Sequence, residues 1–219
     1  MKLFETTVSD FTDNFYHEKL LKKRGFSYIC GTDEVGRGPL AGPVVAAAVI
    51  LPADCTTELF TDSKKTTEAQ RRQILDYLNS IDAPSGIGIL SPSEVDRHNI
   101  HQASLLAMKQ SIEKLAAAFR LPDFILVDGK YSVPLSIPQE SLIKGDSRSA
   151  SIGAASILAK VTRDTIMAKL HDKYPIYNFL ANKGYPTQEH RAALKRHGPC
   201  PEHRRSFKGV LSDEKESTP

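Results

Sequence analysis

Short apolar runs divide the first two thirds of the chain, and each has the length of a β-strand. The first begins at Tyr28 and leads into two adjacent carboxylates, and the second covers residues 43–51 without a polar interruption. Further runs lie at 86–90 and 124–129, with a shorter strand and turn at 142–146. Apolar runs bounded by Gly and Pro predict buried strands. We expect the first two runs to pair as a hairpin.

Helical periodicity fills the remaining segments. It covers 10–24, 68–78, 93–120 and 151–170, and Thr187 is a predicted N-cap for a further helix. The first helix is expected to begin at Ser9 or Asp10 and to end at Gly25. Because strands come early and helices late, we predict an α/β fold whose mixed sheet has helices on its faces. Residues 1–25 form a predicted N-terminal helical segment, 26–211 the main domain, and 212–219 a disordered tail.

Composition restricts the class of protein. The 219 residues are 40% hydrophobic and 25% charged, as in an ordinary soluble domain. Three widely spaced cysteines argue against a disulfide framework. The sequence has no long apolar run and no hydrophobic signal core, so we expect a cytoplasmic protein without a membrane partner. The net charge of +3 permits a polyanionic partner but does not require one.

Four acidic residues stand in distinctive settings. Asp33 and Glu34 end the first strand, Asp128 ends the strand at 124–129, and Asp164 lies on an apolar helix. Neighbouring strand ends line one crevice in an α/β sheet. Convergent carboxylates suit Mg²⁺ or Mn²⁺, and two such ions can activate a water and stabilise the leaving oxygen of a phosphodiester.

Each of these acids also has a purely structural interpretation. Asp164 follows Lys160 by one helical turn and can pair with it or with Arg163. Asp128 can cap the turn before Gly129, and the first two acids can be solvated turn residues. Taken one at a time, the structural interpretation is the more common one.

Basic and aromatic residues extend the candidate site. Arg37 lies between Gly36 and Gly38, whose missing side chains allow a ligand to approach the backbone. Tyr185 can stack on a sugar or base, although a turn tyrosine more often only packs. Candidate phosphate contacts, which can equally form a solvated face, are Lys64, Lys65, Lys144, Arg148 and Lys160. The zinc-type side chains His190, His197, Cys200 and His203 lack a standard ligand spacing, which disfavours a zinc site.

Taken in order, these segments resemble the ribonuclease HII family, the type 2 ribonucleases H. The resemblance covers roughly residues 29–209. Its blocks are GTDEVGRGPLAGPV at 31–44, DSKK at 62–65, VDG at 127–129, KGD at 144–146, SASI at 149–152, AASILAKVTRD at 154–164, GYPT at 184–187 and HRRSF at 203–207.

The resemblance implies a ribonuclease H-like fold, a mixed five-stranded sheet flanked by helices with a helical C-terminal region. It implies a metal-dependent endonuclease that cleaves RNA in RNA–DNA hybrids. Single ribonucleotides in duplex DNA would be nicked on their 5′ side, leaving 3′-hydroxyl and 5′-phosphate ends. The family's metal-binding carboxylates match Asp33, Glu34, Asp128 and Asp164. The resemblance implies that they bind Mg²⁺ or Mn²⁺, and two ions are expected.

The same resemblance assigns substrate contacts. Gly36, Arg37 and Gly38 match the loop that reads the ribose 2′-hydroxyl through backbone groups, and Tyr185 matches the tyrosine at the RNA–DNA junction. Lys64, Lys65 and Lys160 are carried over as phosphate or active-site contacts. The tail lacks an aromatic sliding-clamp motif, and we expect a monomer. A nuclease of the same fold that cuts DNA and a non-catalytic nucleic-acid-binding module remain the alternatives.

Overall fold

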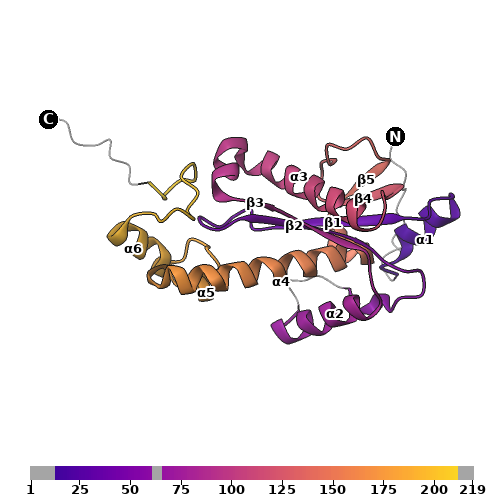
Figure 1. Ribbon diagram of the computed structural model, residues 1–219, viewed down its shortest axis with the longest axis horizontal. Coiled ribbons are helices and arrows are strands. Elements are labelled where there is room, and N and C mark those ends of the chain that lie inside the picture. Colours follow the sequence, from indigo (N-terminus) through magenta and orange to yellow (C-terminus); the bar gives the residue numbers. More distant parts are fainter. Residues whose placement is uncertain (1–12, 61–65, 212–219) are drawn as a thin grey trace.

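A five-stranded sheet forms the centre of the protein, and helices cover both of its faces. The computed structural model describes residues 13–60 and 66–211. Figure 1 shows the long helix α3 on one face of the sheet and α4, with α2, on the other. The strand order is β3-β2-β1-β4-β5. The strands are β1 (Ile29–Val35), β2 (Val44–Ile50), β3 (Ser85–Leu90), β4 (Phe124–Asp128) and β5 (Gln139–Leu142).

The sheet is mixed, as predicted. β2 runs antiparallel to both β1 and β3, whereas β4 runs parallel to β1 and to β5. The expected hairpin pairing of the first two strands is therefore confirmed. Of the shorter strand and turn expected at 142–146, the turn is present as the 3₁₀ turn η4 (Gly145–Ser147), but the strand lies earlier, because β5 ends at Leu142.

Helices lie near the segments that the periodicity predicted, but the first begins only at Tyr16, after a turn at residues 14 and 15, and the short helix at 179–182 was not predicted. The helices are α1 (Tyr16–Lys23), α2 (Glu68–Ser80), α3 (Pro92–Ala118), α4 (Ala150–Lys173), α5 (Phe179–Asn182) and α6 (Gln188–His197). Thr187 caps α6 as predicted, and Gly25 follows α1 with φ +94°. The expected start of the first helix at Ser9 or Asp10 and the tail at 212–219 lie outside the described residues. No helix in the described part of the chain has the length and apolarity needed to cross a membrane.

Two helices lie unusually close to the sheet because glycines face them. A Cβ at Gly31 of β1 would overlap the backbone of α4 at Ser151, and a Cβ at Gly88 of β3 would overlap the carbonyl of Ala107 in α3. Backbone atoms cannot move aside as a flexible side chain can. These glycines therefore fix the distance of α3 and α4 from the sheet.

A buried carboxylate attaches the N-terminal helix to the start of α4. Glu18 accepts hydrogen bonds from the hydroxyls of Ser149 and Ser151, both at 2.6 Å, and from the Ser151 amide at 3.0 Å. Burial raises the pKa of Glu18, although these donors favour the charged form.

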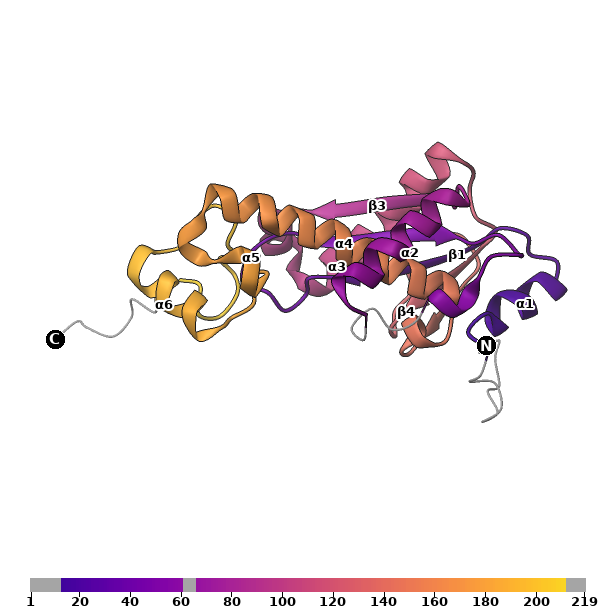
Figure 2. The ribbon, with the colours of Figure 1, turned by 90° about the horizontal axis from the view of Figure 1, so that it is seen from below.

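The C-terminal helices enclose a second, smaller core at one end of the sheet, which Figure 2 shows beside the end of α4. Its buried members are Leu40, Ala41, Met167, Tyr177, Phe179, Leu194, Cys200 and Val210. This core packs on the loop between β1 and β2 through Leu40 and Ala41, and it therefore supports the chain immediately after the Gly36–Arg37–Gly38 segment.

A buried histidine pair crosses this core. The Cys200 amide donates to Nδ1 of His203 at 3.0 Å, so the His203 proton must lie on Nε2, which faces Nε2 of His190 at 3.0 Å. His190 Nε2 is then the acceptor, and its Nδ1 donates to the carbonyl of Tyr185 at 2.9 Å. Each ring is neutral in this arrangement, and an added proton would break one of its bonds.

Acid should therefore weaken this core. Burial lowers the pKa of His190 and lowers that of His203 to about 4. A histidine with a depressed folded-state pKa stabilises the fold above about pH 6.5 and loses that contribution as pH falls toward 4. In urea unfolding, the stability advantage of wild type over His203→Gln should shrink with falling pH by up to about 1.4 kcal/mol per unit. Equal pH slopes for both proteins would contradict this assignment.

Candidate active site

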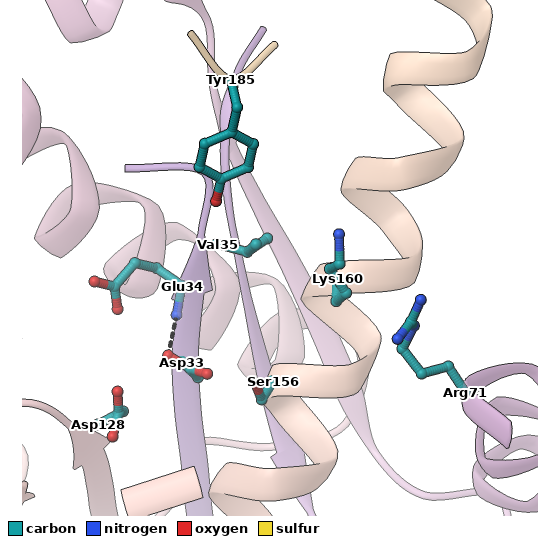
Figure 3. Close-up of a pocket in the computed structure, with 8 residues that line it drawn as sticks. All are labelled: Asp33, Glu34, Val35, Arg71, Asp128, Ser156, Lys160 and Tyr185. Atoms are coloured by element: carbon teal, nitrogen blue, oxygen red, sulfur yellow. Dashed lines mark hydrogen bonds between the residues drawn. The ribbon is translucent and has the colours of Figure 1, made fainter. Parts of the chain in front are cut away.

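Three of the predicted carboxylates meet at the ends of two neighbouring strands. Thr32 of β1 pairs with Val127 of β4 in parallel register, so Asp33 and Asp128 occupy the next positions on the two strands. Together with Glu34 they line one pocket of about 380 Å³. Figure 3 shows the three carboxylates grouped on one side of this pocket. The strand-end argument from the sequence therefore holds for these three acids.

The alternation of side chains along β1 sends Asp33 and Glu34 in different directions. Asp33 faces α4, where it receives a side-chain hydrogen bond from Ser156, and it also accepts from the Glu34 amide at 2.7 Å. Glu34 instead accepts a bond from Arg37 at 2.9 Å. Both acids nevertheless line the same pocket. Asp128 is fixed by the Gly145 amide, which donates to its Oδ1 at 2.7 Å.

The three carboxylates repel one another in a poorly solvated setting. Asp33 is only 7% exposed. Burial raises its pKa well above the ordinary carboxyl value, and the nearby charges of Glu34 and Asp128 raise it further. Burial also raises the pKa of Glu34, against the opposing effect of Arg37. Such a cluster favours protons or a multivalent cation.

The donor chemistry of this cluster fits a hard divalent ion. All three side chains supply carboxylate oxygens, which Mg²⁺ and Mn²⁺ prefer. As the side chains lie, no three His, Cys, Asp or Glu groups among residues 13–60 and 66–211 converge into a ready coordination shell. Binding of an ion by these three groups would therefore require rotation of their carboxylates.

The opposite side of the pocket is basic. Lys160 of α4 and Arg71 of α2 line it, and Tyr185 closes one end with its hydroxyl directed inward (Figure 3). The sequence singled out Lys160 and Tyr185 but missed Arg71, which lies on a helix whose charges look like an ordinary solvated face. Lys64 and Lys65 lie outside the described residues. Lys144 and Arg148 do not line this pocket.

The Gly36–Arg37–Gly38 loop lies against Tyr185. A Cβ on Gly38 would come within 3.5 Å of the tyrosine ring, so the two residues are in near contact. The Leu40 amide also donates to the Gly184 carbonyl at 2.8 Å, which ties the loop to the turn that carries Tyr185. The structure thus joins two segments that the sequence placed almost 150 residues apart.

Two buried arginines donate to backbone carbonyls in and around this loop. Arg204 donates to the carbonyls of Gly36, Arg37 and Gly42 at 2.6–3.1 Å. Arg163 donates to the carbonyls of Ala41, Pro43 and Lys183 at 2.9–3.0 Å. Both belong to blocks that carried the family resemblance, but their bonds to distant carbonyls leave no local sequence pattern.

Asp164 is not brought together with the other three acids. It lines a neighbouring pocket with α2 residues, and its carboxylate accepts a 2.7 Å bond from Lys160. The structural alternative for Asp164, pairing with Lys160, is thus present. A further buried acid, Asp146, directly follows Gly145, whose amide holds Asp128, and is 7% exposed. Its block at 144–146 was noted in the sequence, but Asp146 was treated as part of a turn.

Comparison with known proteins identifies the family. The family model described as ribonuclease HII matches residues 30–210. The ribonuclease HII of Desulfotalea psychrophila is 57% identical over 198 residues, which cover 90% of this chain and 88% of the relative. Among solved structures, ribonuclease H2 from Pyrococcus horikoshii OT3 has a TM-score of 0.67 at 24% identity, covering 84% of this chain and 95% of that one.

A second solved structure, Bst-RNase HIII in complex with Mn²⁺, has a TM-score of 0.67 at 19% identity and covers 84% of this chain and 68% of that one. These likenesses confirm the ribonuclease H-like fold with its mixed five-stranded sheet. The family match and the close relative go further, and they establish an enzyme of the hydrolase class. The chain belongs to the ribonuclease HII family, whose members are endonucleases of the ribonuclease H type, acting on RNA–DNA hybrids.

Proposed function

We propose that this protein nicks duplex DNA on the 5′ side of an embedded ribonucleotide, as well as cutting longer RNA tracts in hybrids, and leaves 3′-hydroxyl and 5′-phosphate ends. One observation carries the proposal. The loop matched to 2′-hydroxyl recognition and Tyr185 adjoin each other at the pocket lined by Asp33, Glu34 and Asp128. A ribose held by the loop would therefore lie beside the carboxylates.

We further propose that Asp33, Glu34 and Asp128 hold Mg²⁺ or Mn²⁺. Bound ions supply Lewis-acid stabilisation and lower the pKa of water. The Mn²⁺ complex of Bst-RNase HIII, which has the same fold, supports this choice of ion. For a fourth carboxylate we propose Asp146 ahead of Asp164: Asp146 directly follows Gly145, whose amide holds Asp128, whereas Asp164 pairs with Lys160 and lines the neighbouring pocket.

The remaining side chains bind and orient the substrate. Lys160 and Arg71 lie opposite the carboxylates and can neutralise phosphates on either side of the scissile bond, so binding should weaken as salt rises. Tyr185 is 45% exposed and presents its ring at the pocket, where a base or sugar can stack on it. The predicted lack of a sliding-clamp motif concerns residues 212–219, outside the described part, and stays a prediction.

Removing one charge from the cluster should stabilise the metal-free protein. In EDTA, Asp33→Asn removes a buried negative charge and its repulsion by the neighbouring carboxylates. The melting temperature should rise by about 2–4 °C for each kcal/mol gained in the free energy of unfolding. Added Mg²⁺ or Mn²⁺ should stabilise wild type but not the variant. The exposed Glu113→Gln serves as the carboxylate-to-amide control and should change stability by less than about 0.5 kcal/mol. A destabilised Asp33→Asn in EDTA would contradict the electrostatic account.

Substitution of Asp128, Asp146 and Asp164 ranks these three acids by their contribution to cleavage. Asp128→Asn should reduce cleavage of an RNA–DNA hybrid below about 1% of wild type while hybrid binding persists. Asp146→Asn should show a similar loss of cleavage, whereas Asp164→Asn should retain activity within about tenfold of wild type. Cleavage rates and gel-shift affinities measured together separate chemistry from binding. Loss of cleavage in Asp164→Asn equal to that in Asp128→Asn would return Asp164 to the metal set.

The substrate assignment is tested with a DNA duplex that carries one ribonucleotide, with the cut mapped at nucleotide resolution. A metal-dependent nick on the 5′ side is expected, and an all-DNA duplex should stay intact. Tyr185→Ala should slow this nick by about tenfold or more through lost stacking, with a smaller effect on long hybrids. Tyr131→Ala, another exposed tyrosine outside the pocket, is the matched control. Equal cutting of both duplexes would favour a DNA nuclease.

A further inference from the structure

Arg204 is a buried cation whose partners are all backbone carbonyls. It is 0% exposed and makes four hydrogen bonds, two of them to Gly42 and one each to Gly36 and Arg37. No carboxylate forms an ion pair with it in the part of the chain that the structure describes. Burying a guanidinium without a counter-ion is costly. Its geometry therefore serves a purpose beyond ordinary packing.

The direction of these bonds fixes the direction of the neighbouring amides. The described residues contain no cis peptide bond, and in a trans peptide the N–H points opposite to the preceding C=O. Because the carbonyls of Gly36 and Arg37 point inward to Arg204, the N–H groups of Arg37 and Gly38 point away from it. Both residues are exposed, and neither amide makes a hydrogen bond within the described chain.

Arg204 is itself held in place. Its own amide donates to the Leu40 carbonyl at 2.8 Å, and its guanidinium lies 5.1 Å from the centre of the Phe207 ring. The following amides of Arg205 and Ser206 both donate to the carboxylate of Asp96 on α3. The backbone that carries Arg204 is thus held by Leu40 on one side and by Asp96 on the other.

We propose that Arg204 is a positioning residue for ribose recognition: by drawing two carbonyls inward, it presents the Arg37 and Gly38 amides to the substrate. The inference rests on the proposed role of this loop in reading the 2′-hydroxyl. Two outward N–H groups on adjacent residues form a small concave donor pair that suits a hydroxyl or phosphate oxygen. Arg204 touches no substrate in this scheme and acts only through the loop.

Arg163 provides a matched control. It is 1% exposed and also donates to three backbone carbonyls, those of Ala41, Pro43 and Lys183. Its side chain packs against Gly36, but it bonds neither the carbonyl of Gly36 nor that of Arg37. Replacing either arginine by lysine keeps the charge but removes the planar set of donors. Both variants should lose stability, but only Arg204→Lys should release the amides in question.

The test compares selectivity with stability. Cleavage of the single-ribonucleotide duplex gives its KM, and an all-DNA duplex of the same sequence, added as a competitive inhibitor, gives Ki. The ratio Ki/KM should fall about tenfold in Arg204→Lys, the value of one lost hydrogen bond, and should stay near wild type in Arg163→Lys. Preserved selectivity in a destabilised Arg204→Lys would overturn the positioning role.

A measurement on wild type covers the case in which Arg204→Lys does not fold. In ¹⁵N-labelled protein, the Arg37 and Gly38 amide resonances should shift more with the ribonucleotide duplex than with the all-DNA duplex. If the Arg37 and Gly38 amide resonances do not shift in a protein that still prefers the ribonucleotide duplex, the inference is overturned and the proposed function stands. A wild-type Ki/KM near one would instead remove the proposed ribose reading itself.

Discussion

The parallel pairing of β1 with β4 is the constraint on which the site depends. It places Asp33 beside Asp128, although the two are far apart in the sequence, and it does so at the point where both strands leave the sheet. Helix α4 then packs on one face of the sheet, and its Ser156 hydrogen-bonds Asp33. The glycines of the sheet admit α3 and α4 this close to it. The register of the strands, the distance of the helices from the sheet and the repulsion between the carboxylates therefore depend on one another.

The molecule places charges of opposite sign on adjoining elements. Repelling carboxylates lie at the strand ends, whereas Arg163 and Arg204 lie buried under the adjacent loop with carbonyl partners. Burial lowers the pKa of Arg163 to about 10 and that of Arg204 to about 9, which leaves both charged at neutral pH. Carbonyl dipoles stabilise these cations without cancelling their charge. The loop can thus offer a positive potential to a phosphate backbone while the carboxylates remain free for cations.

Local pattern was enough to predict much of this structure and failed where contacts are long-range. Apolar runs located four strands, and helical periodicity located most of the helices, because both depend on neighbours in sequence. Strand ends likewise predicted Asp33, Glu34 and Asp128. The interpretation of Asp164 stayed open because a helical acid can face a pocket or its i−4 lysine equally well. Arg71, Ser156 and the two buried arginines had no local signal, since their roles come from tertiary contacts alone.

The large sequence separation between Arg204 and its bonding partners has a consequence for folding during synthesis. Arg204 reaches back 167 residues to Arg37, so a chain leaving the ribosome can complete its sheet before this bond is possible. The strands that carry the carboxylates can thus pair before the loop gains its bonds to Arg204. A nascent or truncated chain that ends before Arg204 would contain the acidic residues but lack these bonds. On the proposed role of Arg204, synthesis of the last part of the chain would be the step that orders the loop.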